Sequence, residues 1–143
     1  MLATGTVVGV IVLAVLVWLY IRTRSQDMLE EMMQKRRGAS RLVTRADYVE
    51  AMAKMPVALS LTDKEFFYEN TDLQASFELA RVDEIEYDNE MQTGHSVPDG
   101  TQVMRLRSHG AAFEFLMPQA DIAKWQAVLP STRSGHAAMK VGA

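Results

Sequence analysis

The sequence contains no cysteine, and it has only three histidines and four prolines among 143 residues. Without cysteine the chain cannot form a disulfide framework, a thiolate metal site or a cysteine nucleophile. The histidines, at positions 95, 109 and 136, are not at the spacing of metal ligands. The patterns HExxH, GxSxG and GxGxxG and the P-loop are also missing. We therefore expect no enzymatic activity, no metal site and no cofactor.

Charge of either sign is unevenly distributed along the chain. Residues 1–46 carry seven Lys or Arg against three Asp or Glu, a net charge of +4. Residues 47–130 carry six Lys or Arg and fifteen Asp or Glu, a net charge of −9. Residues 131–143 add two basic residues, which brings the net charge of the whole chain to −3. Because an acidic domain is repelled by phosphate groups, we expect neither nucleic-acid binding nor phosphoinositide recognition.

One stretch lacks charge altogether: Leu2 to Ile21 reads LATGTVVGVIVLAVLVWLYI. A helix of this length extends roughly 30 Å, which matches the hydrocarbon core of a bilayer. Trp18 and Tyr20 lie near its end, where aromatic rings favour the headgroup level. The alternative is a cleaved signal peptide, but the run exceeds the roughly 7–15 apolar residues of such peptides and has no basic residues before it. The sequence predicts a retained transmembrane helix over residues 1–21.

Basic residues follow this span and none precedes it. The positive-inside rule then predicts a single-pass protein of the cell (inner) membrane, with its N-terminus outside and its C-terminal domain in the cytoplasm. The residues predicted at the membrane interface are Trp18, Tyr20, Arg22, Arg24, Lys35, Arg36 and Arg37.

Gly5 and Gly9 form a GxxxG pattern within the span. Two helix backbones approach each other closely at such glycines, so Gly5 and Gly9 are candidate helix-pairing residues. The alternative is that the two glycines are incidental, because glycine is common in membrane helices.

Residues 22–55 are predicted to form a basic, helical linker. An apolar stripe of Met and Leu at 28, 29, 32 and 33 repeats at helical spacing and ends before Gly38. A second short helix is expected from about Arg45 to Lys54, ended by Pro56. The linker suits the lipid interface or a partner helix, and a solvated spacer carrying positive-inside charges is the alternative.

From Pro56 the hydrophobic period changes from helical to two, which indicates β-strands. An amphipathic helix is predicted between Pro118 and Pro130, with Ile122, Trp125 and Leu129 on one face. The fold class is therefore α+β, with a domain over residues 56–130 and a flexible tail over 131–143. The strands are expected at 57–61, 65–69, 75–79 and 82–87, around Met104 and Leu106, and over 113–117.

This order of about six antiparallel strands and one closing helix resembles pleckstrin-homology-like (PH-like) domains. VALSLTDKEFFY, residues 57–68, is similar to the opening hairpin of bacterial PH-like and GRAM-like domains. FELARVDEI, residues 77–85, is similar to their third strand and the turn after it, and Trp125 lies in the expected C-terminal helix. The resemblance implies a partly closed barrel, one strand short of the usual seven.

One strand carries the candidate partner surface, in which Arg105, Arg107 and His109 alternate. These residues are suited to an anionic peptide or a carboxylate. The alternative is a solvated face that is paired with acidic neighbours. An alternating acidic row, Glu84, Glu86, Asp88 and Glu90, is interpreted as an outward face that attracts a basic partner or keeps the domain off the membrane.

Two functions follow from these patterns. The first is a membrane-anchored, non-catalytic interaction or scaffold module that presents its acidic domain to a protein partner. The second is an accessory subunit of a larger respiratory, photosynthetic or transport complex, held through the transmembrane helix. Lipid or small-molecule sensing is a weaker third.

Overall fold

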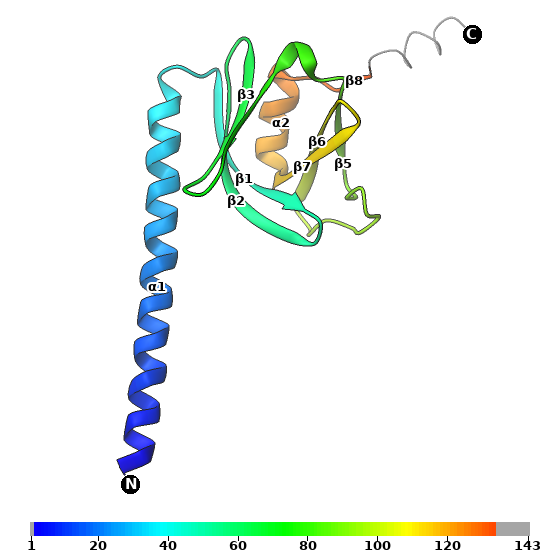
Figure 1. Ribbon diagram of the computed structural model, residues 1–143. Helices are drawn as coiled ribbons and strands as arrows, with labels where there is room; N and C mark the ends of the chain where they lie inside the picture. Colours follow the sequence, from blue (N-terminus) through cyan, green and yellow to red (C-terminus); the bar gives the residue numbers. More distant parts are fainter. Residues whose placement is uncertain (1, 134–143) are drawn as a thin grey trace, which may run out of the picture.

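The computed structural model describes residues 2–133, which form one long helix and a β domain that curves around a second helix (Figure 1). The α+β class predicted from the sequence is confirmed. The elements are α1 (Leu2–Arg37), β1 (Leu42–Glu50), β2 (Ala53–Leu61), β3 (Glu65–Glu69), β4 (Gln74–Glu78), the 3-10 turn Leu79–Arg81, β5 (Glu84–Asp88), β6 (Thr101–Ser108), β7 (Ala111–Pro118), α2 (Gln119–Val128) and β8 (Thr132–Arg133).

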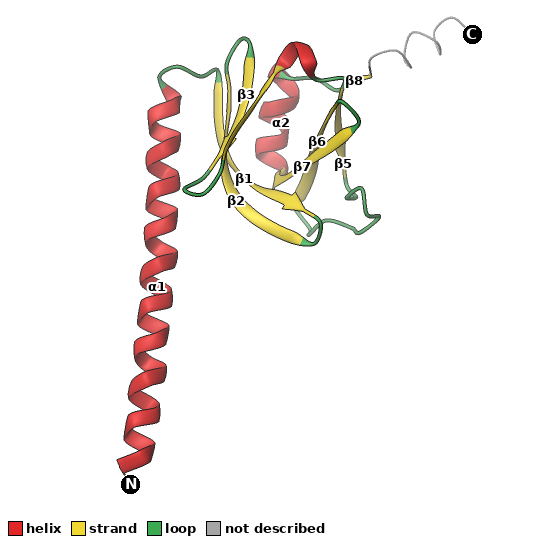
Figure 2. Ribbon diagram, viewed as in Figure 1, coloured by secondary structure: helices red, strands yellow, loops and turns green. Residues whose placement is uncertain are grey.

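The strands form a single sheet in the order β4-β3-β2-β1-β7-β6-β5-β8, and every pairing is antiparallel. Seven of the strands have five to nine residues, and β8 has two. β4 and β8 are the edges, and within the described residues they are not paired with each other. The sheet is therefore strongly curved but open (Figure 2).

The hydrophobic core lies between the concave side of the sheet and α2. Ile122, Trp125 and Leu129 are buried as the helical period predicts, and Trp125 is 0% exposed. The indole Nε1 of Trp125 donates a hydrogen bond to Thr44 Oγ1 at 2.8 Å. Its ring lies 5.5 Å from that of Phe66, which in turn lies 5.4 Å from that of Phe115. Since these residues come from α2, β1, β3 and β7, one cluster joins both halves of the sheet.

The convex side of the sheet is covered in part by the C-terminal half of α1. Leu29 and Met33 pack against Ala58 of β2 and Val43 of β1. Consequently the last five residues of β2, 57–61, are all buried, whereas a strand with one free face would alternate. The small side chains of Ala58 and Ser60 on the convex side leave room for the helix.

The predicted linker helix over about Arg45 to Lys54 is wrong. This segment contains most of β1, a turn at Ala51 and Met52, and the start of β2. β1 pairs with β2 along its whole length and with β7 through Asp47, Tyr48 and Val49, and this pairing outweighs the helical spacing of its few apolar residues. The β domain therefore begins at residue 42, and β1 supplies the strand that the sequence analysis lacked.

Two smaller differences lie at turns and at the C-terminal end. His109 has a φ of +50° and Gly110 one of +80°, so the β6–β7 connection is a two-residue turn in which both residues are left-handed. Part of the predicted tail is ordered, because Thr132 and Arg133 pair with β5. The remainder of the tail, 134–143, lies outside the described residues.

Candidate functional site

The apolar part of α1 is fully exposed, with no described residue of the domain against it. α1 is long and apolar enough to cross a membrane, as the sequence predicts. Among the described residues no heavy atom lies within 4 Å of a Cβ added at Gly5 or Gly9, so this face is free for another helix. At the end of the apolar run the Arg22 guanidinium lies 5.2 Å over the Trp18 ring. The Arg24 Nη1 donates to the Tyr20 hydroxyl at 3.0 Å. The aromatic and basic residues at the end of the apolar run are therefore already in contact with each other in pairs.

Arg36 fixes the far end of α1 to the β domain. Its Nε and Nη2 donate to the two carboxylate oxygens of Glu69 at 2.8 and 3.2 Å, and its guanidinium lies 4.4 Å over the Phe67 ring. The hydrogen bond to Glu69 raises the pKa of Arg36, against the opposing effect of burial. Glu69 is only 5% exposed, so removing Arg36 would leave a buried carboxylate without its hydrogen-bond partner.

The placement of Lys35, Arg36 and Arg37 at the membrane interface stays a prediction, and in the structure Arg36 is paired with Glu69 of the β domain. α1 continues unbroken from the apolar run to Arg37. At 1.5 Å per residue, Arg36 lies about 20 Å beyond Arg22 along the axis, which is further than the Debye length of about 8–10 Å. The linker is thus a rigid spacer docked on the sheet, and Arg22 and Arg24 are the basic residues next to the apolar run.

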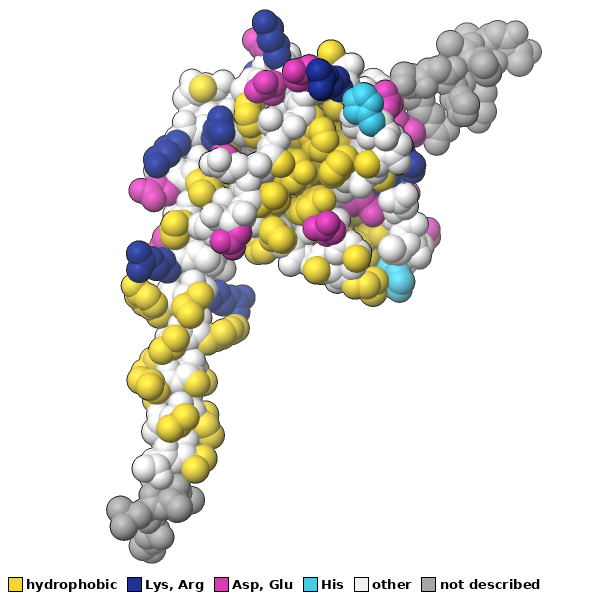
Figure 3. Space-filling model, viewed as in Figure 1, with side chains coloured by type: hydrophobic (Ala, Val, Ile, Leu, Met, Phe, Trp, Pro, Cys, Tyr) yellow, Lys and Arg dark blue, Asp and Glu magenta, His cyan; other side chains and the backbone are white. Residues whose placement is uncertain are grey.

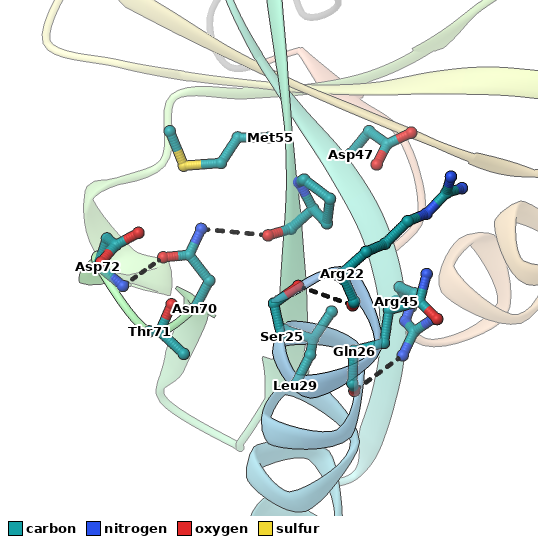
Figure 4. Close-up of a pocket in the computed structure, with 11 residues that line it drawn as sticks. Arg22, Ser25, Gln26, Leu29, Arg45, Asp47, Met55, Asn70, Thr71 and Asp72 are labelled. Carbon is teal, nitrogen blue, oxygen red and sulfur yellow. Dashed lines mark hydrogen bonds between the residues drawn. The ribbon is translucent and has the colours of Figure 1, made fainter. Parts of the chain in front are cut away.

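A groove opens where α1 diverges from the convex side of the sheet (Figure 4). Its volume is about 440 Å³, and it is lined by α1, by β1, by the start of β2 and by the β3–β4 turn. Figure 4 shows Arg22, Arg45 and Asp47 along one side and the turn Asn70–Asp72 along the other. The turn is held by Asn70, whose Nδ2 donates to the Pro56 carbonyl at 3.1 Å and whose Oδ1 accepts from Asp72 N at 2.8 Å.

β4 forms an open edge beside an apolar surface, which Figure 3 shows as a large hydrophobic area on the domain. Phe77 of β4 and Phe113 of β7 meet with ring centroids 4.6 Å apart, and both are only partly buried. The flanking backbone bonds, Asn70 N to Leu73 O and Leu79 N to Lys64 O, fix the pattern of the β3–β4 ladder. Because bonded pairs alternate, Gln74, Ser76 and Glu78 direct their backbone N–H and C=O groups away from β3.

Arg105 is not part of an open partner surface, because it is only 3% exposed. Its guanidinium contacts the carboxylate oxygens of Glu114, Glu86 and Asp88 at 3.0, 3.1 and 3.5 Å and the carbonyl oxygen of Glu90 at 2.8 Å. Burial alone would lower the pKa of Arg105, but its hydrogen bonds to Glu114 and Glu86 raise that pKa overall. Arg105 therefore ties the β5–β6 loop to β6 and β7.

Arg107 and His109, the other two residues of that predicted surface, are more exposed than Arg105. Arg107 is half-exposed and lies 3.6 Å from Glu84 and 3.9 Å from Glu86. His109 is an exposed turn residue whose backbone N–H donates to Asp83 at 3.1 Å. The three side chains do not form a continuous cationic patch. The acidic row over residues 84–90 instead serves largely as their counter-charge.

Neither the groove nor the open edge is evident from the sequence patterns. The groove joins residues up to 50 positions apart, from Arg22 to Asp72, and only the docking of α1 brings them together. One signal was available: Ala58 and Ser60 are small residues within an apolar strand, which is typical of a strand that a helix crosses. No group of three or more His, Asp and Glu suited to a metal ion is present within the described residues.

Comparisons with known proteins give no relative for this chain: no family model, no curated protein and no solved structure matches it.

Proposed function

We propose that the chain is a single-pass, membrane-anchored, non-catalytic protein that presents its β domain as a protein-interaction or scaffold module. The support for the anchor is the exposed apolar run of α1 with aromatic and basic residues at its end. Following the positive-inside rule, the domain lies on the cytoplasmic side of the inner membrane, where Arg22 and Arg24 emerge.

The fold that we propose for the domain is PH-like. The support is the count of seven principal antiparallel strands followed by one helix, together with the sequence similarity of residues 57–68 and 77–85. Recognition of β1 as a strand brings the number to the seven usual in that family. The open order of the sheet, with β4 and β8 as edges, corresponds to a partly closed barrel.

The observation that carries the interaction role is the open β4 edge. It offers the outward N–H and C=O groups of Gln74, Ser76 and Glu78 next to the half-buried rings of Phe77 and Phe113. An extended segment can add to such an edge, with main-chain hydrogen bonds giving affinity and the apolar surface receiving alternate side chains. The partner that fits is an extended segment with apolar side chains at every second position.

A second copy in the same membrane does not fit this edge as an antiparallel partner. β2 runs in the direction of α1, since Pro56 lies in the groove with Arg22 and Ala58 packs on Leu29 and Met33. β3 reverses this direction and β4 restores it. Two copies inserted in the same orientation therefore direct their β4 strands alike, which prevents antiparallel pairing between them.

The experiment is affinity purification of the intact chain in mild detergent, with mass spectrometry of the proteins that co-purify. Ser76→Pro removes an outward N–H without touching the β3–β4 ladder, and Ser76→Ala is the control that keeps it. We expect Ser76→Pro to lose a partner that Ser76→Ala retains. Retention of every partner by Ser76→Pro would contradict the role of the edge.

The alternative is an accessory subunit of a larger integral membrane complex, held through α1. The free Gly5 and Gly9 face favours it. Under this alternative, replacing both glycines by Leu releases the chain from its complex, whereas Ser76→Pro has no effect.

A further inference from the structure

The groove between α1 and the sheet carries two arginines and two aspartates with few internal partners. Within the described residues, Arg22 has no carboxylate within 4.0 Å, and Arg45 makes only long contacts, 3.5 Å to the Gln26 carbonyl and 4.0 Å to Glu30. The side chains of Asp47 and Asp72 form no ion pair there either. The groove therefore presents two guanidiniums without a close carboxylate partner on one side and the Asp72 carboxylate on the other (Figure 4).

The position of the groove along α1 determines which layer of a bilayer lies beside it. Arg22 is the first charged residue after the apolar run, and Leu29 forms the inner end of the groove. The helix rises about 10 Å between them, and the headgroup layer on one side of a bilayer is about 5–8 Å thick. If α1 spans the membrane, which is the proposed function on which this step rests, the groove opens at the headgroup layer.

The chemistry of the groove distinguishes between headgroups. Two guanidiniums suit one phosphodiester, because each can donate two parallel hydrogen bonds to its oxygens. Asp72, on the other side, suits an ammonium group, and Leu29, Met55 and Pro56 supply apolar contacts for the glycerol end. The two aspartates and the charge of −9 over residues 47–130 oppose a polyanionic headgroup.

We propose that this groove binds the headgroup of a zwitterionic phospholipid from the adjoining leaflet, with the phosphate between Arg22 and Arg45 and the ammonium at Asp72. Such a lipid joins α1 to the β3–β4 turn. It thereby holds the domain in one orientation above the membrane.

The test uses the full chain in nanodiscs of equimolar phosphatidylethanolamine and phosphatidylglycerol, extracted into mild detergent for native mass spectrometry. We expect phosphatidylethanolamine to be retained on the intact chain, and retention to fall about tenfold in Arg45→Gln and in Asp72→Asn. The matched controls are Arg41→Gln and Asp63→Asn, which change the same residue types at exposed positions outside the groove. Equal retention of the two lipids, or equal loss in the controls, would overturn the proposal.

Two further arms separate the alternatives. Water-soluble glycerophosphoethanolamine, titrated against the same protein, should bind much more weakly than the lipid; binding of equal strength would assign the groove to a small soluble ligand instead. Carbonate extraction of membranes tests the anchor independently. A chain that remains in the pellet but shows no groove-dependent retention refutes the lipid site alone, whereas a chain that is extracted refutes the anchor.

Discussion

Arg36 and Glu69 form a two-point ion pair, with N–O distances of 2.8 and 3.2 Å, between the last turn of α1 and the end of β3. The two residues are 33 positions apart, and their pairing joins the long apolar helix and the β domain into one body. With Leu29 and Met33 packed below it, this pair determines how the domain is held relative to the apolar run.

Arg36→Ala should lower the free energy of unfolding by about 1–3 kcal/mol, because it leaves the buried Glu69 carboxylate without its charged hydrogen-bond partner. The measurement is urea denaturation of the chain in detergent. Arg37→Ala is the control: Arg37 makes one exposed contact of 3.5 Å with Glu30, which contributes less than about 1 kcal/mol. An equal effect of both variants would contradict the role assigned to the pair.

Thr44→Val should destabilise the domain by about 1–3 kcal/mol even though it adds apolar surface. The substitution leaves the Trp125 indole N–H without an acceptor inside the core. Denaturation is followed by Trp125 fluorescence in a Trp18→Phe background, since these are the two tryptophans of the chain. Thr93→Val, in an exposed loop, should leave the midpoint within about 0.5 kcal/mol of the parent.

This hydrogen bond also explains where sequence reasoning succeeded and failed. The apolar alternation in β3, β6 and β7 and the spacing of Ile122, Trp125 and Leu129 were enough to place those elements. In β1 the inward positions are occupied by Thr44, Ala46 and Tyr48, so the period of two is weak and the helical spacing of Ala46, Val49 and Met52 misleads. Thr44 faces inward and accepts a hydrogen bond from Trp125, which is 81 residues away. No local sequence pattern reveals this contact.

The candidate site shows the same limit. The sequence predicted that Arg105, Arg107 and His109 form one exposed surface, but Arg105 is buried. Burial of Arg105 depends on Glu114 of the neighbouring strand and on the β5–β6 loop that folds over it. The groove and the β4 edge arise from the packing of segments that are distant in the sequence, so hydrophobic periodicity could not predict them.

Arg105→Met should destabilise the domain by about 3–5 kcal/mol, because removing one member of a buried charged network leaves the others uncompensated. The double variant Arg105→Met/Glu114→Leu should recover part of this loss, since it removes the most buried carboxylate of the network as well. Thermal unfolding of the three proteins measures both effects. No recovery in the double variant would show that the cost arises from packing and not from charge.

Alkaline pH should destabilise the domain, and ionisation of Tyr68 should account for part of this loss. Burial raises the pKa of Tyr68 to about 12, with Tyr48 and Glu50 adding to the effect. Because an unfolded tyrosine has a pKa of about 10, this contribution to stability is complete below about pH 10 and is lost as the pH rises to about 12. Unfolding free energies measured across that window should fall less steeply in Tyr68→Phe. Identical slopes would contradict this assignment.

The depth of the domain relative to the bilayer follows from the direction of β2 along α1. Pro56 lies in the groove with Arg22, so the β1–β2 turn at Met52, which is 76% exposed, should lie near the headgroup layer, whereas Arg37 lies about 22 Å beyond Arg22. The absence of cysteine allows single labels at 24, 37 and 52 through Arg24→Cys, Arg37→Cys and Met52→Cys. Headgroup-attached spin labels should quench fluorophores at 24 and 52 and spare the one at 37. Equal quenching at 24 and 37 would show that α1 lies along the membrane surface, and this outcome would exclude both the spanning anchor and the groove at headgroup level.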